Sequence, residues 1–197
     1  MRLKKRRRAE GEPTSENEEA PENCILTIRE CVHFNAAVET RYTLKLLKAL
    51  DDASEFALKN CTWPCDARVY LYINSGGGCA FAGLSIMDHI RLNRVPIITI
   101  ADGYVASAAT FILLGGYERK SMSNAKILIH QLSTAFWGKY ADLLDEAQNS
   151  EELMETFRKV YVQNTKLHGN RLESLLKKEL HMNATSSLNW GIVDEIW

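Results

Sequence analysis

The sequence lacks the features that mark several common classes of protein. No apolar run approaches the roughly 18 residues that a membrane-spanning helix needs. The longest apolar runs, residues 95–100 and 105–114, have the length of core segments. The formal net charge of −1 leaves no overall positive charge to attract nucleic acid. We therefore expect neither a membrane-spanning protein nor a basic nucleic-acid-binding protein.

The sequence also lacks the cysteine spacing of a disulfide framework, because its five cysteines are an odd number without a regular pattern. Cys61 and Cys65 flank Thr-Trp-Pro, but no second cysteine or histidine pair follows at a spacing that would complete a zinc site. We interpret these residues as ordinary reduced cysteines. We expect a cytoplasmic protein that holds no metal and no cofactor of its own.

Composition divides the chain into two parts. Residues 1–23 begin with the basic run "MRLKKRRRAE" and continue with the acidic run "GEPTSENEEAPEN". Neither run can build a core, so we predict a disordered, charged N-terminal tail or a removable leader. Because 46% of the whole chain is hydrophobic, residues 24–197 are expected to form one domain with a substantial core.

This domain alternates between strand-like and helix-like patterns. After extended chain over residues 24–38, we predict strands over residues 68–73, 95–101 and 126–129. We predict helices over residues 37–58, 80–92, 107–114 and 141–167, and two shorter ones before and after Met182. Such alternation favours an α/β fold whose strands are mostly parallel.

A glycine-rich turn, "NSGGG", lies between the first of these strands and the helix that follows it. Gly78 and Gly83 have the spacing of a phosphate-binding P-loop, but Leu84 stands where that motif needs a lysine. The dinucleotide fingerprint also fails, because Phe81 replaces its last glycine. Backbone N–H groups in such a turn instead suit the short-lived oxyanion of acyl transfer, which requires a nucleophile and a base elsewhere.

Ser107 and His130 are the candidates for nucleophile and base. Ser107 lies among alanines after the strand over residues 95–101, where an Asp-Gly pair predicts a turn before an apolar helix. His130 follows the strand over residues 126–129, and an imidazole suits general-base catalysis. Taken singly, each also fits a structural role, as a helix N-cap or as a hydrogen-bonded histidine. Because parallel strands end on one side of a sheet, we expect the glycine turn and both side chains to meet.

Four collinear motifs resemble the ClpP family of self-compartmentalised serine peptidases: "YLYINSGGG", "GYVASAATFIL", "NAKILIHQ" and "NWGIVDEI". The resemblance covers residues 25–197 and implies a ClpP- or crotonase-like α/β spiral of strand–helix units. It implies that Ser107 is the nucleophile and His130 the base. It also implies that Gly77 or Gly78, together with Ala108, supplies the N–H groups of the oxyanion hole. The family glycine loop reads N-S-P-G-G, and this chain has glycine in place of the proline.

The family's triad acid is an aspartate fifteen positions before the Asp of the closing G-x-V-D motif. The same count back from Asp194 gives Glu179, which the resemblance therefore implies as the acid of this chain. Two alternatives stay open. Glu179 could be a solvated glutamate beside Lys177 and Lys178, or a Ser–His dyad could work alone, because the third residue mainly orients the imidazole.

The resemblance also implies partners. Family members form two stacked seven-membered rings, joined by a strand–helix handle that matches residues 131–168, with its strand over residues 132–138. An AAA+ unfoldase, which uses ATP, docks in aromatic-lined clefts at positions that match Tyr70 and Tyr72. Asp102 and Lys120 stand where the family pattern is apolar, so their charges should weaken an apolar anchor. Expected partners are copies of this chain, an unfoldase and unfolded polypeptides, with no nucleic acid or membrane.

The sequence therefore predicts a serine endopeptidase that hydrolyses peptide bonds of unfolded polypeptides inside an oligomeric chamber, through an acyl-enzyme. Two other functions stay open. One is a non-catalytic ring subunit, which the glutamate at the acid position motivates. The other is a crotonase-like acyl-CoA enzyme, which would use a backbone oxyanion hole without Ser107 as a nucleophile.

Overall fold

The computed structural model describes residues 24–197, and the tail predicted over residues 1–23 lies outside the described residues. The described residues form one eight-stranded sheet in which β2, β3, β4, β5 and β8 are parallel neighbours in that order. β6 is parallel to the second half of β4, while β1 and β7 are antiparallel to β2 and β6. The strands are β1 (Ile25–Ile28), β2 (Cys31–Phe34), β3 (Val69–Ser75), β4 (Ile97–Ala106), β5 (Glu118–Ser121), β6 (Lys126–Leu128), β7 (Met182–Asn183) and β8 (Glu195–Ile196). The mostly parallel sheet confirms the predicted α/β class.

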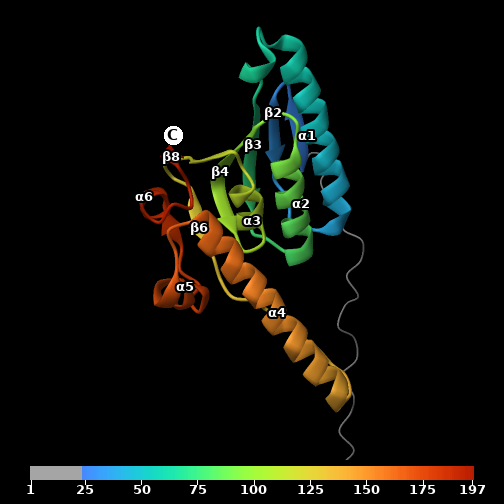
Figure 1. Ribbon diagram of the computed structural model, residues 1–197, viewed down its shortest axis with the longest axis vertical. Coiled ribbons are helices and arrows are strands. Elements are labelled where there is room, and N and C mark those ends of the chain that lie inside the picture. The colour runs from blue at the N-terminus through green and yellow to red at the C-terminus, as the bar shows by residue number, and fades with distance from the viewer. Residues whose placement is uncertain (1–23) are drawn as a thin grey trace, which may run out of the picture.

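Six α-helices and one 3-10 turn accompany the sheet in this part of the chain. They are α1 (Thr40–Asn60), η1 (Pro64–Asp66), α2 (Ala80–Leu92), α3 (Ala109–Leu114), α4 (Tyr140–Asn164), α5 (Gly169–Leu176) and α6 (Ala184–Asn189). α1 packs against β1, β2 and β3, and α2 lies between α1 and α3, so these helices cover one face of the sheet (Figure 1). All residues of α3 are buried, as its uniformly apolar sequence predicted.

β4 is longer than the sequence predicted, and its length determines where Ser107 lies. We expected a turn at Asp102 and Gly103, but the strand continues through them to Ala106. Its first half pairs with β3 and β5, and after a register shift at Asn74 of β3 its second half pairs with β6. Gly103 has the positive φ of +80° at this change of partner. The strand therefore ends directly before Ser107, beside β6.

The long helix α4 projects away from the body (Figure 1). Its C-terminal half packs into the body through Phe157, Val160 and Tyr161. Its N-terminal half is exposed, and Leu144 in this half is 53% exposed. The strand predicted over residues 132–138 is not formed, because residues 129–139 pair with no other described strand of this chain. A strand requires a neighbouring strand, and this segment has none among the described residues.

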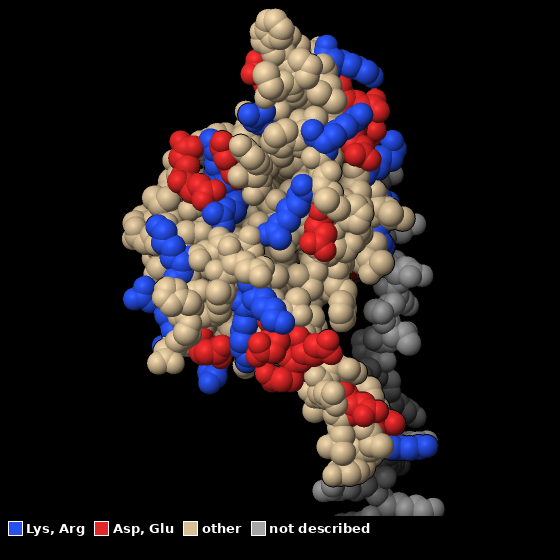
Figure 2. All heavy atoms as spheres, viewed as in Figure 1, with Lys and Arg blue, Asp and Glu red and all other residues tan. Residues whose placement is uncertain are grey.

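The surface carries charges of both signs, and Figure 2 shows them interspersed over one face of the body. Within residues 24–197, no helix is both long enough and apolar enough to span a membrane. In the same residues, no group of three or more His, Cys, Asp or Glu side chains is arranged to hold a metal ion, and the five cysteines are free.

Candidate active site

Ser107 occupies the turn between β4 and α3 in a strained backbone conformation. Its φ is +54°, a left-handed value that is uncommon for any residue except glycine. The N-cap position of α3 is Ala108, and no side chain caps the helix, so the capping role left open for Ser107 is absent. Within the described residues, Ser107 forms hydrogen bonds only through its backbone. Its hydroxyl group therefore has no hydrogen-bond partner in this part of the chain.

The glycine loop packs directly against Ser107. A Cβ atom on Gly77 would lie 2.6 Å from Ser107 Cβ, so only glycine fits at this position. The N–H of Gly77 donates to Ser75 Oγ at 3.2 Å. By contrast, the N–H groups of Gly78 and Ala108 donate to no other group in the described part of the chain. These two N–H groups are therefore available to an oxyanion, whereas that of Gly77 already has an acceptor.

His130 follows β6, the strand that lies beside the end of β4. Ser107 N–H donates to Leu128 O at 2.9 Å. Leu128 is the last residue of β6 and precedes His130 by two positions, so this bond holds the serine close to the segment that carries the histidine. His130 Nδ1 lies 2.6 Å from Gln131 O, and because a carbonyl only accepts, Nδ1 carries the hydrogen. Nε2 of this tautomer can therefore accept a proton. Sequence reasoning missed the Gln131 carbonyl, because a backbone acceptor leaves no signature in the residue type.

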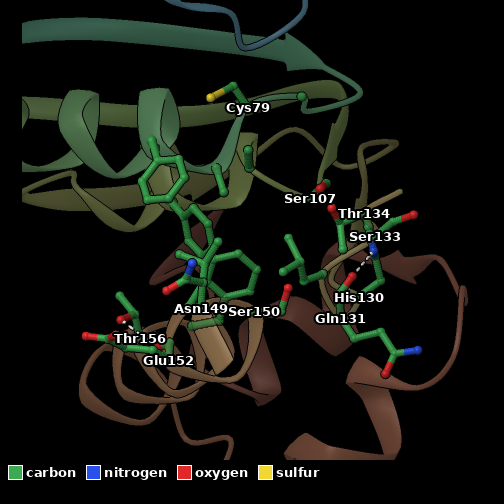
Figure 3. A pocket seen from close by; sticks show the side chains of 18 of the residues that line it. Cys79, Ser107, His130, Gln131, Ser133, Thr134, Asn149, Ser150, Glu152 and Thr156 are labelled. Atoms are coloured by element: carbon green, nitrogen blue, oxygen red, sulfur yellow. Dashed lines mark hydrogen bonds between the residues drawn. The ribbon is translucent and has the colours of Figure 1, made fainter. Parts of the chain in front are cut away.

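Ser107 and His130 line one cavity of about 770 Å³, together with Gly78 and Ala108. Figure 3 shows Ser107 and His130 at the same end of this cavity. No hydrogen bond joins their side chains within residues 24–197, and such contacts are often long before a substrate binds. The remaining wall includes apolar side chains from α2, α3, α4 and the segment after His130: Phe81, Phe111, Leu132, Leu153 and Phe157.

Among the described residues, no hydrogen bond joins Glu179 to His130. Glu179 is exposed in the loop between α5 and β7 and lines no part of the cavity. The start of that loop is nevertheless close to the histidine, because Gln131 N–H donates to Leu176 O at 2.7 Å. The role of Glu179 as triad acid stays a prediction.

The two residues predicted for a partner-docking cleft both lie on β3 and have different neighbours. Tyr70 lies against the ring of Trp197, with centroids 6.4 Å apart. Lys120 lies over the same ring at 4.4 Å and donates to Glu195 at 2.6 Å. Tyr72 stacks on a histidine of β2, with centroids 4.6 Å apart. Lys120 is one of the two charges that we expected to weaken an apolar docking cleft. Glu195 of the same chain neutralises this charge.

The fold and the cavity together have the make-up of an acyl-transfer site: a strained serine, a histidine beside it and a turn with available N–H groups. A protein-family model described as Clp protease matches residues 64–197, which include Ser107, His130, the glycine loop and α4. The chain belongs to the Clp protease family. This match confirms the resemblance drawn from the four motifs and the ClpP-like α/β fold that it implied.

Proposed function

We propose that this chain is a serine endopeptidase that hydrolyses peptide bonds of unfolded polypeptides. The observation that carries the proposal is the strained Ser107, whose free hydroxyl shares a cavity with His130 and the N–H groups of Gly78 and Ala108. Strained backbone conformations persist only where the surrounding structure enforces them, and they concentrate at active sites. Membership of the Clp protease family supports the same chemistry.

The proposed reaction is acyl transfer in two steps. His130 Nε2 removes the Ser107 Oγ proton as Oγ bonds to the substrate carbonyl carbon, and the oxyanion accepts hydrogen bonds from Gly78 and Ala108. His130 then gives the proton to the amide nitrogen, the C–N bond breaks and the amine leaves. Water, deprotonated by His130, hydrolyses the remaining ester and restores Ser107.

The imidazole has an orienting partner without an acidic side chain. The carbonyl of Gln131 fixes the hydrogen on Nδ1, which is the task that the third residue of a triad performs. Glu179, the acid that the resemblance implies, would have to approach His130 from the loop that follows Leu176. The proposal therefore assigns the main orienting contact to the Gln131 carbonyl and an auxiliary role to Glu179.

We also propose that copies of this chain assemble into stacked heptameric rings through the handle, residues 131–168. The handle exposes apolar side chains, with Trp137 at 97% and Leu144 at 53% exposure. Its segment over residues 129–139 has no strand partner among the described residues. Both features gain stability when a second copy covers them. The substrate would then reach the chamber as a chain unfolded by an ATP-driven AAA+ partner.

The experiment is the hydrolysis of a reduced and alkylated protein by the purified assembly. We expect Ser107→Ala to lower the rate by at least about a thousandfold, because the covalent step is lost. Ser123→Ala is the matched control, because Ser123 is an exposed serine outside the cavity, and it should retain the wild-type rate. Equal rates for wild type and Ser107→Ala would refute the proposal.

A non-catalytic ring subunit is the second candidate. It is favoured by the absence of Glu179 from the cavity lining and by the missing hydrogen bond between Ser107 and His130 among the described residues. This candidate predicts intact rings that hydrolyse nothing, and a ring whose properties do not change when Ser107 becomes alanine.

A further inference from the structure

The buried hydroxyl of Tyr161 in α4 is connected to Ser107 through a single side chain, that of Thr110. Tyr161 Oη lies 2.7 Å from Thr110 Oγ1, and Thr110 Oγ1 lies 2.6 Å from Ser107 O. Tyr161 is 1% exposed and Thr110 is fully buried, so both hydroxyl groups lie in the interior of the body. Three residues from two helices and the turn between β4 and α3 therefore form one hydrogen-bonded chain.

The chemical groups determine which atom donates each of these two hydrogen bonds. Ser107 O is a carbonyl and can only accept, so the single hydroxyl hydrogen of Thr110 points to it. Thr110 Oγ1 must then accept from Tyr161, which donates its own hydrogen. Burial raises the pKa of Tyr161, so the phenol keeps this hydrogen throughout the neutral pH range.

The acceptor at the end of this chain belongs to the reactive turn. Ser107 O and Ala108 N–H are the two ends of one planar peptide group, so fixing the carbonyl also fixes the N–H on the opposite side. Ser107 O accepts a second hydrogen bond from Thr110 N–H at 2.9 Å. Consecutive hydrogen bonds in a buried site polarise one another, so donation to the carbonyl strengthens Ala108 N–H as a donor.

We propose that Thr110 and Tyr161 are positioning residues of the oxyanion hole, acting through the peptide group between Ser107 and Ala108. This inference rests on the proposed peptidase function. Tyr161 orients the Thr110 hydroxyl, the Thr110 hydroxyl orients and polarises the peptide, and Ala108 N–H meets the developing oxyanion. Tyr161 reaches this site from α4, the helix whose other half forms the projecting part of the handle.

A purely structural role makes a different prediction. Threonine near a helix start often donates to a preceding carbonyl without any further partner. Tyr161 also packs on the ring of Phe111, with centroids 5.7 Å apart. If these contacts served packing alone, removing the two hydroxyl groups would lower stability and leave the acylation rate unchanged. The rate of acylation at Ser107 therefore separates the two roles.

The test measures the second-order rate constant for labelling of Ser107 by a fluorophosphonate in the assembled protein, together with kcat and KM for a peptide. We expect Tyr161→Phe and Thr110→Val each to slow labelling roughly tenfold and to lower kcat by a similar factor with little change in KM. Thr110→Ser keeps the hydroxyl and should restore at least about half of the wild-type rate. The double variant Tyr161→Phe/Thr110→Val should be no slower than Thr110→Val alone, because both changes break one chain.

Val160→Ala is the control for lost packing. Val160 is buried in α4 next to Tyr161, lies outside the cavity and takes no part in the hydroxyl chain. It should lower the free energy of unfolding and keep the wild-type labelling rate. Labelling of Tyr161→Phe at the wild-type rate, or equal slowing by Thr110→Ser and Thr110→Val, would overturn this inference alone. A wild-type assembly that is never labelled would overturn the proposed peptidase function, and this inference with it.

Discussion

Gly77 and Ser107 touch at the centre of the site, and neither position tolerates much change. Gly77 has a φ of +92°, and a Cβ atom there would lie 2.6 Å from Ser107 Cβ. Ser107 itself has a φ of +54°. The glycine loop therefore supports the strained serine from one side, and the hydroxyl of Thr110 donates to its carbonyl from the other.

The first prediction concerns this contact. Gly77→Ala should displace Ser107, reduce peptidase activity by at least about a hundredfold, and lower the free energy of unfolding by roughly 1–3 kcal/mol through backbone strain and overlap. Urea unfolding and peptide hydrolysis measure the two effects. Gly76→Ala is the control for stability, because a Cβ atom on Gly76 meets nothing within 4 Å. A Gly77→Ala protein as stable and active as wild type would contradict the described packing.

The second prediction at this scale concerns Glu179. Because the Gln131 carbonyl already fixes the tautomer of His130, Glu179→Gln should lower kcat by less than about tenfold. A loss near ten-thousandfold, the size seen when an imidazole is held in the wrong tautomer, would instead make Glu179 the triad acid. The comparison requires kcat of both proteins at saturating peptide, with native mass confirming equal assembly.

The residue types in the sequence allow part of the candidate site to be predicted, but not all of it. That Ser107 and His130 line one cavity could be predicted, because each follows an apolar strand pattern and parallel strands end together. The partners that orient them could not. Gln131 acts through its backbone, and Tyr161 reaches Thr110 across 51 positions of sequence. No local pattern encodes a contact of that kind.

At the scale of elements, local periodicity placed the long segments well and the short ones poorly. α2 has the predicted bounds, because both ends of its apolar pattern are distinct. β5, with the sequence ERKS, has no apolar pattern and becomes a strand only by pairing with β4 and β8. In α1, Leu44 is 77% exposed, while Leu46 is buried. The helical repeat of apolar residues does not by itself determine which of two adjacent faces of α1 is buried. Packing against the sheet determines it.

β8 is two residues long, so side chains contribute much of its attachment. Lys120 of β5 donates to Glu195 of β8 at 2.6 Å and lowers the pKa of that carboxyl group from its usual value. A carboxyl group whose pKa is lowered by folding stabilises the fold at neutral pH, and the contribution disappears as pH falls through the lowered pKa. Trp197 N–H, which donates to Ser121 O at 2.8 Å, reports on this attachment.

The third prediction follows from this pair. The protection factor of the Trp197 amide, corrected for the intrinsic exchange rate, should decrease as the medium becomes acidic, by less than about tenfold because the pair is exposed. Glu195→Gln should show the lower protection already at neutral pH and no further loss in the same acidic range. An unchanged pH dependence in Glu195→Gln would mean that other groups attach β8.

In the described molecule as a whole, the outer handle leaves large apolar side chains exposed. α4 extends away from the body, and its outer half has no buried residue. Exposed apolar side chains on this half and on the segment before it include Trp137, Tyr140, Leu143 and Leu144. Burying one such side chain contributes roughly 1.5–3 kcal/mol. Many copies of a small contact can therefore stabilise a large assembly.

The fourth prediction tests this surface. Leu144→Glu should shift the protein from the full assembly to smaller species in native mass spectrometry, because each interface would bury a charge in place of an apolar group. Gln163→Glu adds the same charge to α4 at an exposed position in the half that packs on the body, and it should assemble normally. Unchanged assembly of Leu144→Glu would show that the outer handle is not the contact between copies.

We propose Ser107 as a reactive nucleophile in an assembled peptidase. Its most direct test is the native mass of the wild-type assembly before and after reaction with a fluorophosphonate, followed by mapping of the modified peptide. We expect an oligomer in which each subunit gains one adduct, located on Ser107 and absent from Ser107→Ala and His130→Ala. An intact oligomer that gains no adduct, or one modified equally after Ser107→Ala, would contradict it.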